Sequence, residues 1–206
     1  MVKEQLKRII VENQERMPFR LFKRHAATLV DTRQIHAVVG LRRVGKTHFL
    51  YQMANELLER GVPRETLVLI NFEDERLVGL TSERLGLVLE AYYELYPDRV
   101  GDELHLFFDE IQTVPGWERF VARLFEEKRY RIRITGSSSK LLSKEIATAL
   151  RGRAVTTNLY PLSFKEFAAY KGVAITEKLP YSRDRFKAVK LLEEYLTWGG
   201  PLCQHG

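Results

Sequence analysis

The chain has 206 residues, of which 45% are hydrophobic and 29% charged, and its formal net charge is +6. The length is sufficient for one substantial α/β core with a small appendage, and the composition is that of a soluble globular protein. No apolar run approaches the roughly 20 residues of a membrane-spanning helix, and Lys3, Lys7 and Arg8 interrupt the region where a secretory signal would need its apolar core. The single cysteine, Cys203, has no partner within the chain for a disulfide. We therefore expect a cytoplasmic protein with no membrane partner.

Apolar residues at helical and strand spacing predict an alternating order of elements. A first helix is expected over residues 2–16, and a basic connector follows up to Arg24. Strands are predicted at 34–39, 67–72, 104–108, 131–135 and 155–160. Further helices are predicted at 46–60, 82–96, 117–128 and 140–150. Strands and helices that alternate at this spacing indicate β-α-β crossovers and a mostly parallel sheet.

The turn after the first predicted strand is a complete phosphate loop of the form G-x-x-x-x-G-K-[ST]. Its glycines let the backbone N–H groups converge on phosphate oxygens, and the following helix adds its positive dipole end. In this motif Lys46 binds the β- and γ-phosphates and Thr47 is a ligand of Mg²⁺. ATP and Mg²⁺ are thus the predicted cofactors. The expected nucleotide-binding residues are Gly40, Leu41, Arg42, Arg43, Val44, Gly45, Lys46, Thr47 and His48.

Two acidic residues, Asp109 and Glu110, follow the third predicted strand. An aspartate at this place can hold Mg²⁺ opposite Thr47, usually through water molecules. The glutamate after it points toward the γ-phosphate and can polarise the attacking water. Acids gathered at a helix N-terminus would give the same pattern. Behind a complete phosphate loop at β-α-β spacing we favour the catalytic interpretation.

A polar cluster, Thr135-Gly-Ser-Ser-Ser139, follows the fourth predicted strand. In nucleotidases with an additional catalytic glutamate, this strand inserts between the strands of the phosphate loop and of the Asp-Glu pair. We therefore expect Ser137 to hydrogen-bond the γ-phosphate or the attacking water, with Ser138 close behind. The alternative for this cluster is the N-cap of helix 140–150, a role that suits Ser139.

Arg151 and Arg153 lie just before the last predicted strand. An arginine there can reach the γ-phosphate of a neighbouring subunit, which makes a homo-oligomer a candidate assembly. Capping of the C-terminus of helix 140–150 is the alternative role for both arginines. The Asn-Lys-x-Asp motif that reads guanine is absent from the sequence, which argues against a GTPase.

The basic balance of the chain leaves DNA as a further candidate partner. ATP is itself an anion, however, and most arginines alternate with glutamates, as on ordinary solvated helix faces. The alternative to an ATPase is a nucleotide-gated interaction module, or a DNA-associated one, with little hydrolysis. A small-molecule kinase would use the same loop, but the sequence contains neither an arginine-rich lid nor a visible acceptor site.

Taken together, the motifs resemble those of the prokaryotic predicted ATPases of the AAA+ superfamily, in which a domain of unknown function follows the ATPase core. The resemblance covers roughly residues 15–200. It rests on six successive segments: Gly40-Leu-Arg-Arg-Val-Gly-Lys-Thr47, Ile70-Asn-Phe-Glu-Asp-Glu-Arg-Leu77, Phe108-Asp-Glu-Ile-Gln-Thr-Val-Pro-Gly-Trp117, Ile134-Thr-Gly-Ser-Ser-Ser-Lys-Leu-Leu142, Leu150-Arg-Gly-Arg153 and Leu159-Tyr-Pro-Leu-Ser-Phe-Lys-Glu-Phe167.

The resemblance implies a three-layer α/β P-loop NTPase fold whose parallel five-stranded sheet has the order 5-1-4-3-2, with helices on both faces. It implies an ATPase core over residues 25–170, preceded by a helix and connector over 1–24 and followed by a helical region over 171–206. Asp109 matches the metal position, Glu110 the water activator, Ser137 the sensor, and Arg151 or Arg153 the finger region. Family members continue with Gly-Gly-Phe-Pro-Glu, whereas this chain reads Gly199-Gly-Pro-Leu-Cys-Gln-His-Gly206. We therefore expect the C-terminal region to be cut short, by truncation or by a frame shift.

Overall fold

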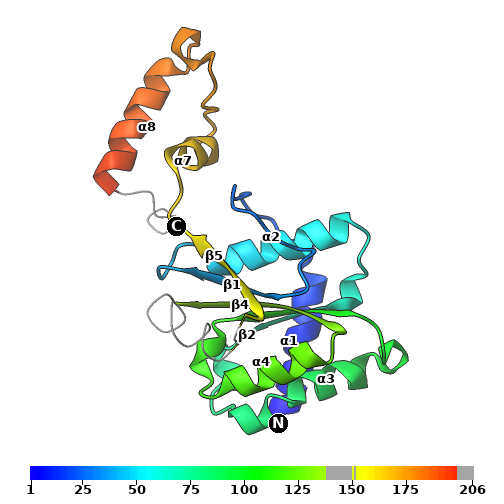
Figure 1. Ribbon diagram of the computed structural model, residues 1–206. Coiled ribbons are helices and arrows are strands. Elements are labelled where there is room, and N and C mark those ends of the chain that lie inside the picture. The colour runs from blue at the N-terminus through cyan, green and yellow to red at the C-terminus, as the bar shows by residue number, and fades with distance from the viewer. Residues whose placement is uncertain (138–149, 151, 199–206) are drawn as a thin grey trace.

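The computed structural model describes residues 1–137, 150 and 152–198. Its centre is a sheet of five parallel strands with helices on both faces (Figure 1). The strands are β1 (Ile35–Gly40), β2 (Leu67–Asn71), β3 (Leu104–Asp109), β4 (Tyr130–Ser137) and β5 (Ala154–Leu159). Their order is β2-β3-β4-β1-β5, which is the predicted order 5-1-4-3-2 read from the other edge. The predicted insertion of the fourth strand between the third and the first is thus confirmed.

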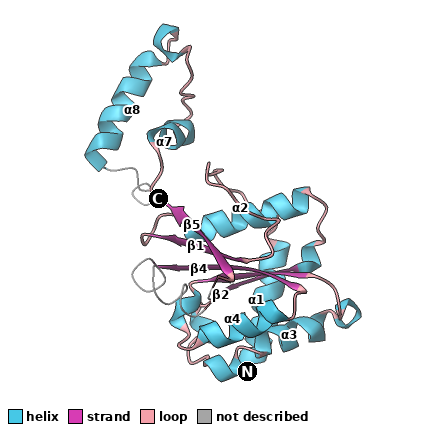
Figure 2. Ribbon diagram, in the orientation of Figure 1, coloured by secondary structure: helices cyan, strands magenta, loops and turns pink. Residues whose placement is uncertain are grey.

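Helices cover the two faces of the sheet unequally (Figure 2). One face carries α1 (Val2–Glu15), α3 (Leu87–Leu95) and α4 (Trp117–Glu126), and the other carries α2 (Lys46–Glu59). Residues of β1 alternate between the two cores: Ala37 and Val39 pack on the first side and Val38 on the α2 side. This period of two, with both faces covered, explains why the sequences of β1 and β3 read as nearly continuous apolar runs, whereas β4 departs from this pattern at Arg131 and Arg133.

A third and smaller cluster lies after β5, where α7 (Phe164–Tyr170) packs against α8 (Arg185–Trp198). Figure 1 shows this pair projecting from the sheet beyond the end of β5. Its buried hydrophobic residues are Ala168, Val173 and Ala188. Within the described ranges no helix is both long enough and apolar enough to cross a membrane.

Predicted and observed elements agree to within one or two residues at most boundaries, with one clear difference. The helix expected over 82–96 is split into a 3-10 turn, Ser82–Arg84, and α3 from Leu87 onward. Gly86 lies at the junction, and glycine is a poor helix former because its backbone loses more freedom on ordering than that of other residues. The helix predicted over 140–150 lies, apart from Leu150, outside the described residues.

Candidate nucleotide site

The phosphate loop joins the carboxyl end of β1 to the first turn of α2. β1 ends at Gly40 and α2 begins at Lys46. Between them Arg43 (φ 63°) and Gly45 (φ 94°) adopt left-handed backbone conformations, which turn the chain sharply. Gly45 is the N-cap of α2, so the unpaired N–H groups of the first helical turn lie beside the loop. This strand, loop and helix form the backbone arrangement that the motif requires.

Gly40, the last residue of β1, lies tightly against β5. A Cβ atom at this position would lie 2.4 Å from the carbonyl oxygen of Leu159 and 2.9 Å from Cγ1 of Val44. Both contacts are far below van der Waals distance, and the first is with backbone, which cannot turn aside. The absence of a side chain therefore lets β1 and the loop fit against β5.

We expect Gly40→Ala to lower the free energy of unfolding by about 1–3 kcal/mol, because the added methyl group overpacks this contact. Urea denaturation measures the change. The control is Gly86→Ala, where the nearest atom to a new Cβ is the Arg123 guanidinium nitrogen at 3.9 Å and the backbone is already helical. That variant should be as stable as the parent or slightly more so. Equal stability of Gly40→Ala and the parent would contradict the proposed clash.

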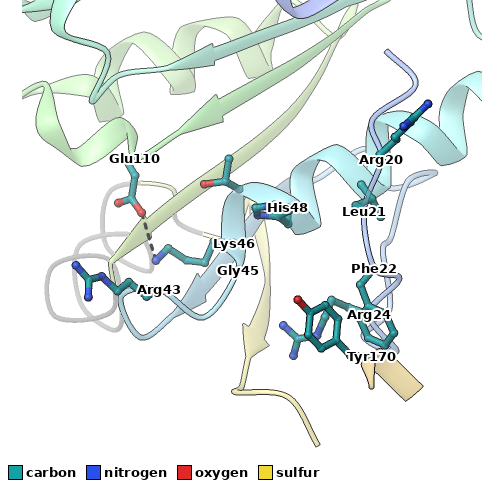
Figure 3. A pocket seen from close by; sticks show the side chains of 11 residues that line it. Arg20, Leu21, Phe22, Arg24, Arg43, Gly45, Lys46, His48, Glu110 and Tyr170 are labelled. Carbon is teal, nitrogen blue, oxygen red and sulfur yellow. Dashed lines mark ion pairs between the residues drawn. The ribbon is translucent and has the colours of Figure 1, made fainter. Parts of the chain in front are cut away.

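The ammonium group of Lys46 is buried and held by oxygens on several sides. Its Nζ lies 3.3 Å from the carbonyl oxygen of Leu41, 3.5 Å from that of Gly40 and 3.2 Å from Oε1 of Glu110. Figure 3 shows the ion pair with Glu110 across the mouth of the loop. A lysine that is 4% exposed in such a position keeps a concentrated positive charge directly beside the loop.

Asp109 is the last residue of β3 and is fully buried. The hydroxyl of Thr47 donates a hydrogen bond of 2.7 Å to one carboxylate oxygen, and the hydroxyl of Thr135 donates to the other. Burial raises the pKa of Asp109, and the two hydroxyl donors oppose that shift in part. The structure thus brings together the two residues predicted as metal ligands, Thr47 and Asp109.

The backbone of Glu110 is left-handed, with φ 49°. Its carboxylate pairs with Lys46, whereas that of Asp109 accepts hydrogen bonds from Thr47 and Thr135. A left-handed conformation is strained in a residue with a side chain, and Thr135 helps to hold that of Glu110 by accepting a hydrogen bond from the Glu110 N–H at 3.0 Å. The second carboxylate oxygen, Oε2, accepts a 2.6 Å hydrogen bond from Nε2 of Gln112. Thr135 therefore contacts both acidic residues, a role that the sequence analysis missed.

A cavity of about 580 Å³ opens beside the loop. One end is lined by Lys46, Thr47 and Glu110, and the other by the connector after α1 and by Tyr170 of α7 (Figure 3). There the rings of Phe22 and Tyr170 meet edge to face with their centroids 5.7 Å apart. The lining residues that sequence reasoning missed are Arg20, Leu21, Phe22, Arg24 and Tyr170. The basic stretch around Pro18 was interpreted as an ordinary connector, and nothing in the sequence singled out Tyr170 of α7.

The remaining residues of the predicted loop differ in their surroundings. Val44 is buried, whereas Leu41, Arg42 and Arg43 are exposed. Arg43 and the exposed His48 also line the cavity. Val44 and Lys46 are therefore buried at the end of the loop next to α2, whereas residues 41–43 form its exposed outer turn.

Of the predicted sensor and finger residues, the structure describes only the backbone of Ser137 and the whole of Arg153. β4 ends at Ser137, which is paired in register with Gly40, so its backbone adjoins the loop; its side chain lies outside the described part. Ser138, Ser139 and Arg151 also lie outside the described residues. Arg153 precedes β5 at the edge of the sheet opposite the loop, where its guanidinium pairs with Glu126 at 2.7 Å. It does not join the site of its own chain.

Comparison with known proteins identifies the family. A family model described as AAA domain matches residues 32–168, well over half of the chain. A protein of Methanocaldococcus jannaschii, described as uncharacterized, is 41% identical over 168 residues, which cover 81% of this chain and 35% of that protein. An uncharacterized protein of Haemophilus influenzae is 34% identical over 173 residues, covering 82% of this chain and 40% of that protein. The chain thus spans less than half the length of these two relatives.

A solved structure supports the same grouping at the level of fold. The Hsp104–ADP complex of S. cerevisiae superimposes with a TM-score of 0.51 at 14% sequence identity, over 97% of this chain and 28% of that chain. At such low identity the likeness concerns the fold alone. With the matched family model, the sheet order and the phosphate loop in agreement, the chain belongs to the AAA domain family and has the P-loop NTPase fold of AAA+ proteins.

Proposed function

We propose that the chain binds Mg²⁺-ATP in the cavity beside the phosphate loop and hydrolyses it, and that the nucleotide state changes the conformation of the segments around the cavity. The observation that carries the proposal is the convergence of Lys46, Glu110 and the Thr47–Asp109 pair at one end of this cavity. Membership of the AAA domain family supports nucleotide binding. So does the likeness in fold to Hsp104, whose solved structure is an ADP complex.

The loop end of the cavity suits the phosphates. Lys46 offers a buried cation, and the N-terminus of α2 offers backbone N–H groups and its dipole. Phosphoryl transfer to water needs charge neutralisation and positioning more than covalent chemistry. At the other end, Phe22 and Tyr170 provide aromatic surfaces beside which a nucleotide base can stack.

The oxygen atoms of Thr47 and Asp109 fit Mg²⁺, which prefers hard oxygen ligands and takes few of them from protein when phosphate and water supply the rest. A cation beside the buried Asp109 would favour the ionised carboxylate, whose pKa burial raises. Among the residues that the structure describes, no group of three histidine, cysteine or acidic side chains forms a metal site by itself. Bound Mg²⁺ would neutralise part of the phosphate charge.

Glu110 is our proposed activator of the attacking water. In the structure its carboxylate is shared between Lys46 and Gln112. A phosphate that takes up the Lys46 charge would compete with this ion pair and leave one carboxylate oxygen to accept a hydrogen bond from water. Gln112, from the turn that follows, would keep the other oxygen in place.

The proposal is tested by Mg²⁺-ATP turnover and ATP binding in the parent and in Glu110→Gln. The amide keeps the size of the side chain but cannot act as a base, so we expect kcat to fall about 100- to 1,000-fold while ATP affinity changes less than about threefold. Glu83→Gln, which neutralises an exposed acid away from the cavity, is the matched control and should retain the parent rate.

Equal turnover of Glu110→Gln and the parent would contradict the assigned role. Tight ATP binding without turnover in either protein would instead favour a nucleotide-gated module. A specific rate that rises with protein concentration would favour an arginine finger from a neighbouring subunit over helix capping, the two roles that the sequence leaves open for Arg151 and Arg153.

A further inference from the structure

Arg24, in the connector between α1 and β1, is buried and connects three separate parts of the chain. Its guanidinium donates from Nη1 to the carbonyl oxygen of Val44 at 2.9 Å and from Nη2 to that of Tyr160 at 2.7 Å. Nε forms an ion pair with Oε1 of Glu166 at 3.0 Å. Arg24 is 5% exposed. A planar guanidinium presents its donors from three separate nitrogen atoms in fixed directions, whereas the three donors of an ammonium all leave a single atom.

The contact with Val44 acts directly on the phosphate loop, because Val44 is the residue before Gly45. The peptide bond between them is planar and trans, so its carbonyl oxygen and its N–H point in opposite directions. A guanidinium that holds the Val44 carbonyl therefore also sets the direction of the Gly45 N–H. Gly45 lines the cavity and begins the turn into α2. Backbone N–H groups of such loops are the phosphate donors.

The direction of the Arg24 guanidinium depends in turn on Glu166, the third residue of α7. Glu166 is buried, and its carboxylate also accepts hydrogen bonds from the backbone N–H groups of His25 and Ser163. The Ser163 hydroxyl caps the same helix by accepting from the Glu166 N–H. The carboxylate is thus fixed by the first turn of α7 and by the connector, and cannot turn away without breaking several hydrogen bonds.

We propose that Arg24 is a positioning residue of the phosphate loop, oriented by Glu166, and that ATP affinity therefore depends on how α7 is seated against the connector. The inference rests on the proposed binding of ATP in the cavity. Arg24 acts through the Val44 peptide. By linkage, ATP that selects the ordered loop must also favour the seated position of α7.

Two substitutions separate the loop contact from the cost of leaving a buried charge unpaired. Arg24→Lys keeps a cation for Glu166 but loses the fork that also holds Val44 and Tyr160. The double variant Arg24→Gln with Glu166→Gln removes both charges, so no buried carboxylate is left without its cation. The double variant decides the test if Arg24→Lys does not fold.

The matched control is Asn55→Ala. Asn55 of α2 accepts from the N–H of Phe19 at 2.9 Å and donates to its carbonyl oxygen at 2.8 Å. Its removal loosens the same connector without touching Val44. The dissociation constant for Mg²⁺-ATP is measured by titration, and the melting temperature is recorded for each protein.

We expect the dissociation constant to rise about tenfold or more in both Arg24 variants and less than about threefold in Asn55→Ala at a comparable loss of melting temperature. Amide hydrogen exchange gives a second readout: ATP should slow exchange in residues 164–170 of the parent, and this effect should be lost in the Arg24 variants. If Arg24 had a purely structural role, its substitution would change the exchange rates of residues 164–170 by the same factor with and without ATP.

The two proposals fail in different ways. A parent that binds ATP, beside Arg24 variants whose affinity falls no more than that of Asn55→Ala, would overturn the positioning role alone. A parent that binds no ATP would overturn the proposed function and the positioning role with it.

Discussion

Replacing Lys46 by methionine should weaken ATP binding by about 100-fold, equivalent to about 3 kcal/mol. Lys46 is 4% exposed, and its ammonium nitrogen lies within 3.5 Å of the Gly40 and Leu41 carbonyl oxygens and of Glu110. A phosphate in the loop would accept a charge-assisted hydrogen bond from it in surroundings that hold little water, where such a bond is strong. Methionine fills the space of the aliphatic stem, so the loss reports the charge rather than a cavity.

Calorimetric titration with Mg²⁺-ATP measures this loss, and thermal unfolding checks that the variant is folded. The control is Lys23→Met, which removes one positive charge from a connector side chain that is 71% exposed and does not line the cavity. That variant should bind ATP within about twofold of the parent, since an exposed charge is largely screened. Unchanged affinity in Lys46→Met would exclude Lys46 from the phosphate site.

The parts of the site that sequence predicts well are contiguous in the chain. The phosphate loop is one eight-residue segment, and Asp109 and Glu110 directly end a strand, so local pattern was sufficient. Thr135 could not be assigned in this way. It meets Asp109 only because β4 lies next to β3, and the two residues are 26 positions apart. Arg24 and Glu166 are 142 positions apart; Glu166 lies in the last of the segments that resemble the family and Arg24 in none of them, and nothing in the sequence predicts that the two residues meet.

The arginines of β4 show a second limit of prediction from sequence. The segment Arg131-Ile-Arg-Ile-Thr135 alternates charged and apolar residues, a pattern typical of a strand with one exposed face. β4 is instead the central strand, and Arg133 is 1% exposed. Its Nη2 donates to the carbonyl oxygen of Val30 at 2.6 Å, and its guanidinium lies 5.0 Å from the centre of the Phe107 ring. A buried cation of this kind depends on tertiary contacts that no local pattern encodes.

Two buried histidines lie beside this cation. His36 of β1 is paired in register with Arg133, and Nδ1 of His105 in β3 lies 3.3 Å from Nη1 of Arg133. Arginine has no acceptor atom, so Nδ1 of His105 must accept this hydrogen bond and the ring is neutral. Burial, and next the charge of Arg133, lower the pKa of both histidines to about 4. Glu103, 3.9 Å from Nε2 of His105, opposes the shift only in part.

These shifts predict a loss of stability in mild acid. In the unfolded chain a histidine takes up its proton near pH 6.5, whereas in the folded chain it does so only near pH 4. The contribution of the two neutral histidines to the free energy of unfolding is therefore complete above about pH 7, and it is lost as the pH falls from 6.5 toward 4. Between pH 7.5 and pH 5.0 we expect each histidine to lower the free energy of unfolding by about 2 kcal/mol, or about 4 kcal/mol together. Denaturant titrations at the two pH values measure the loss.

Buried Glu166 acts at lower pH. Burial raises its pKa, but hydrogen bonds from the His25 N–H, from Ser163 and from Arg24 outweigh that effect and lower it to about 2. Its contribution is therefore lost mainly below pH 4.5, outside the measured interval.

Substitution of one histidine tests the origin of the acid sensitivity. His105→Gln keeps an acceptor for Arg133 but cannot be protonated, so the loss between pH 7.5 and pH 5.0 should be smaller than that of the parent by about 2 kcal/mol. His25→Gln removes an exposed histidine and should keep the full loss of the parent. If His105→Gln lost as much stability as the parent, the acid sensitivity would have to arise elsewhere. If its loss were about 2 kcal/mol smaller than that of the parent, the burial of Arg133 in the central strand would be coupled to the neutral form of His105, and protonation of that ring would weaken the fold at its centre.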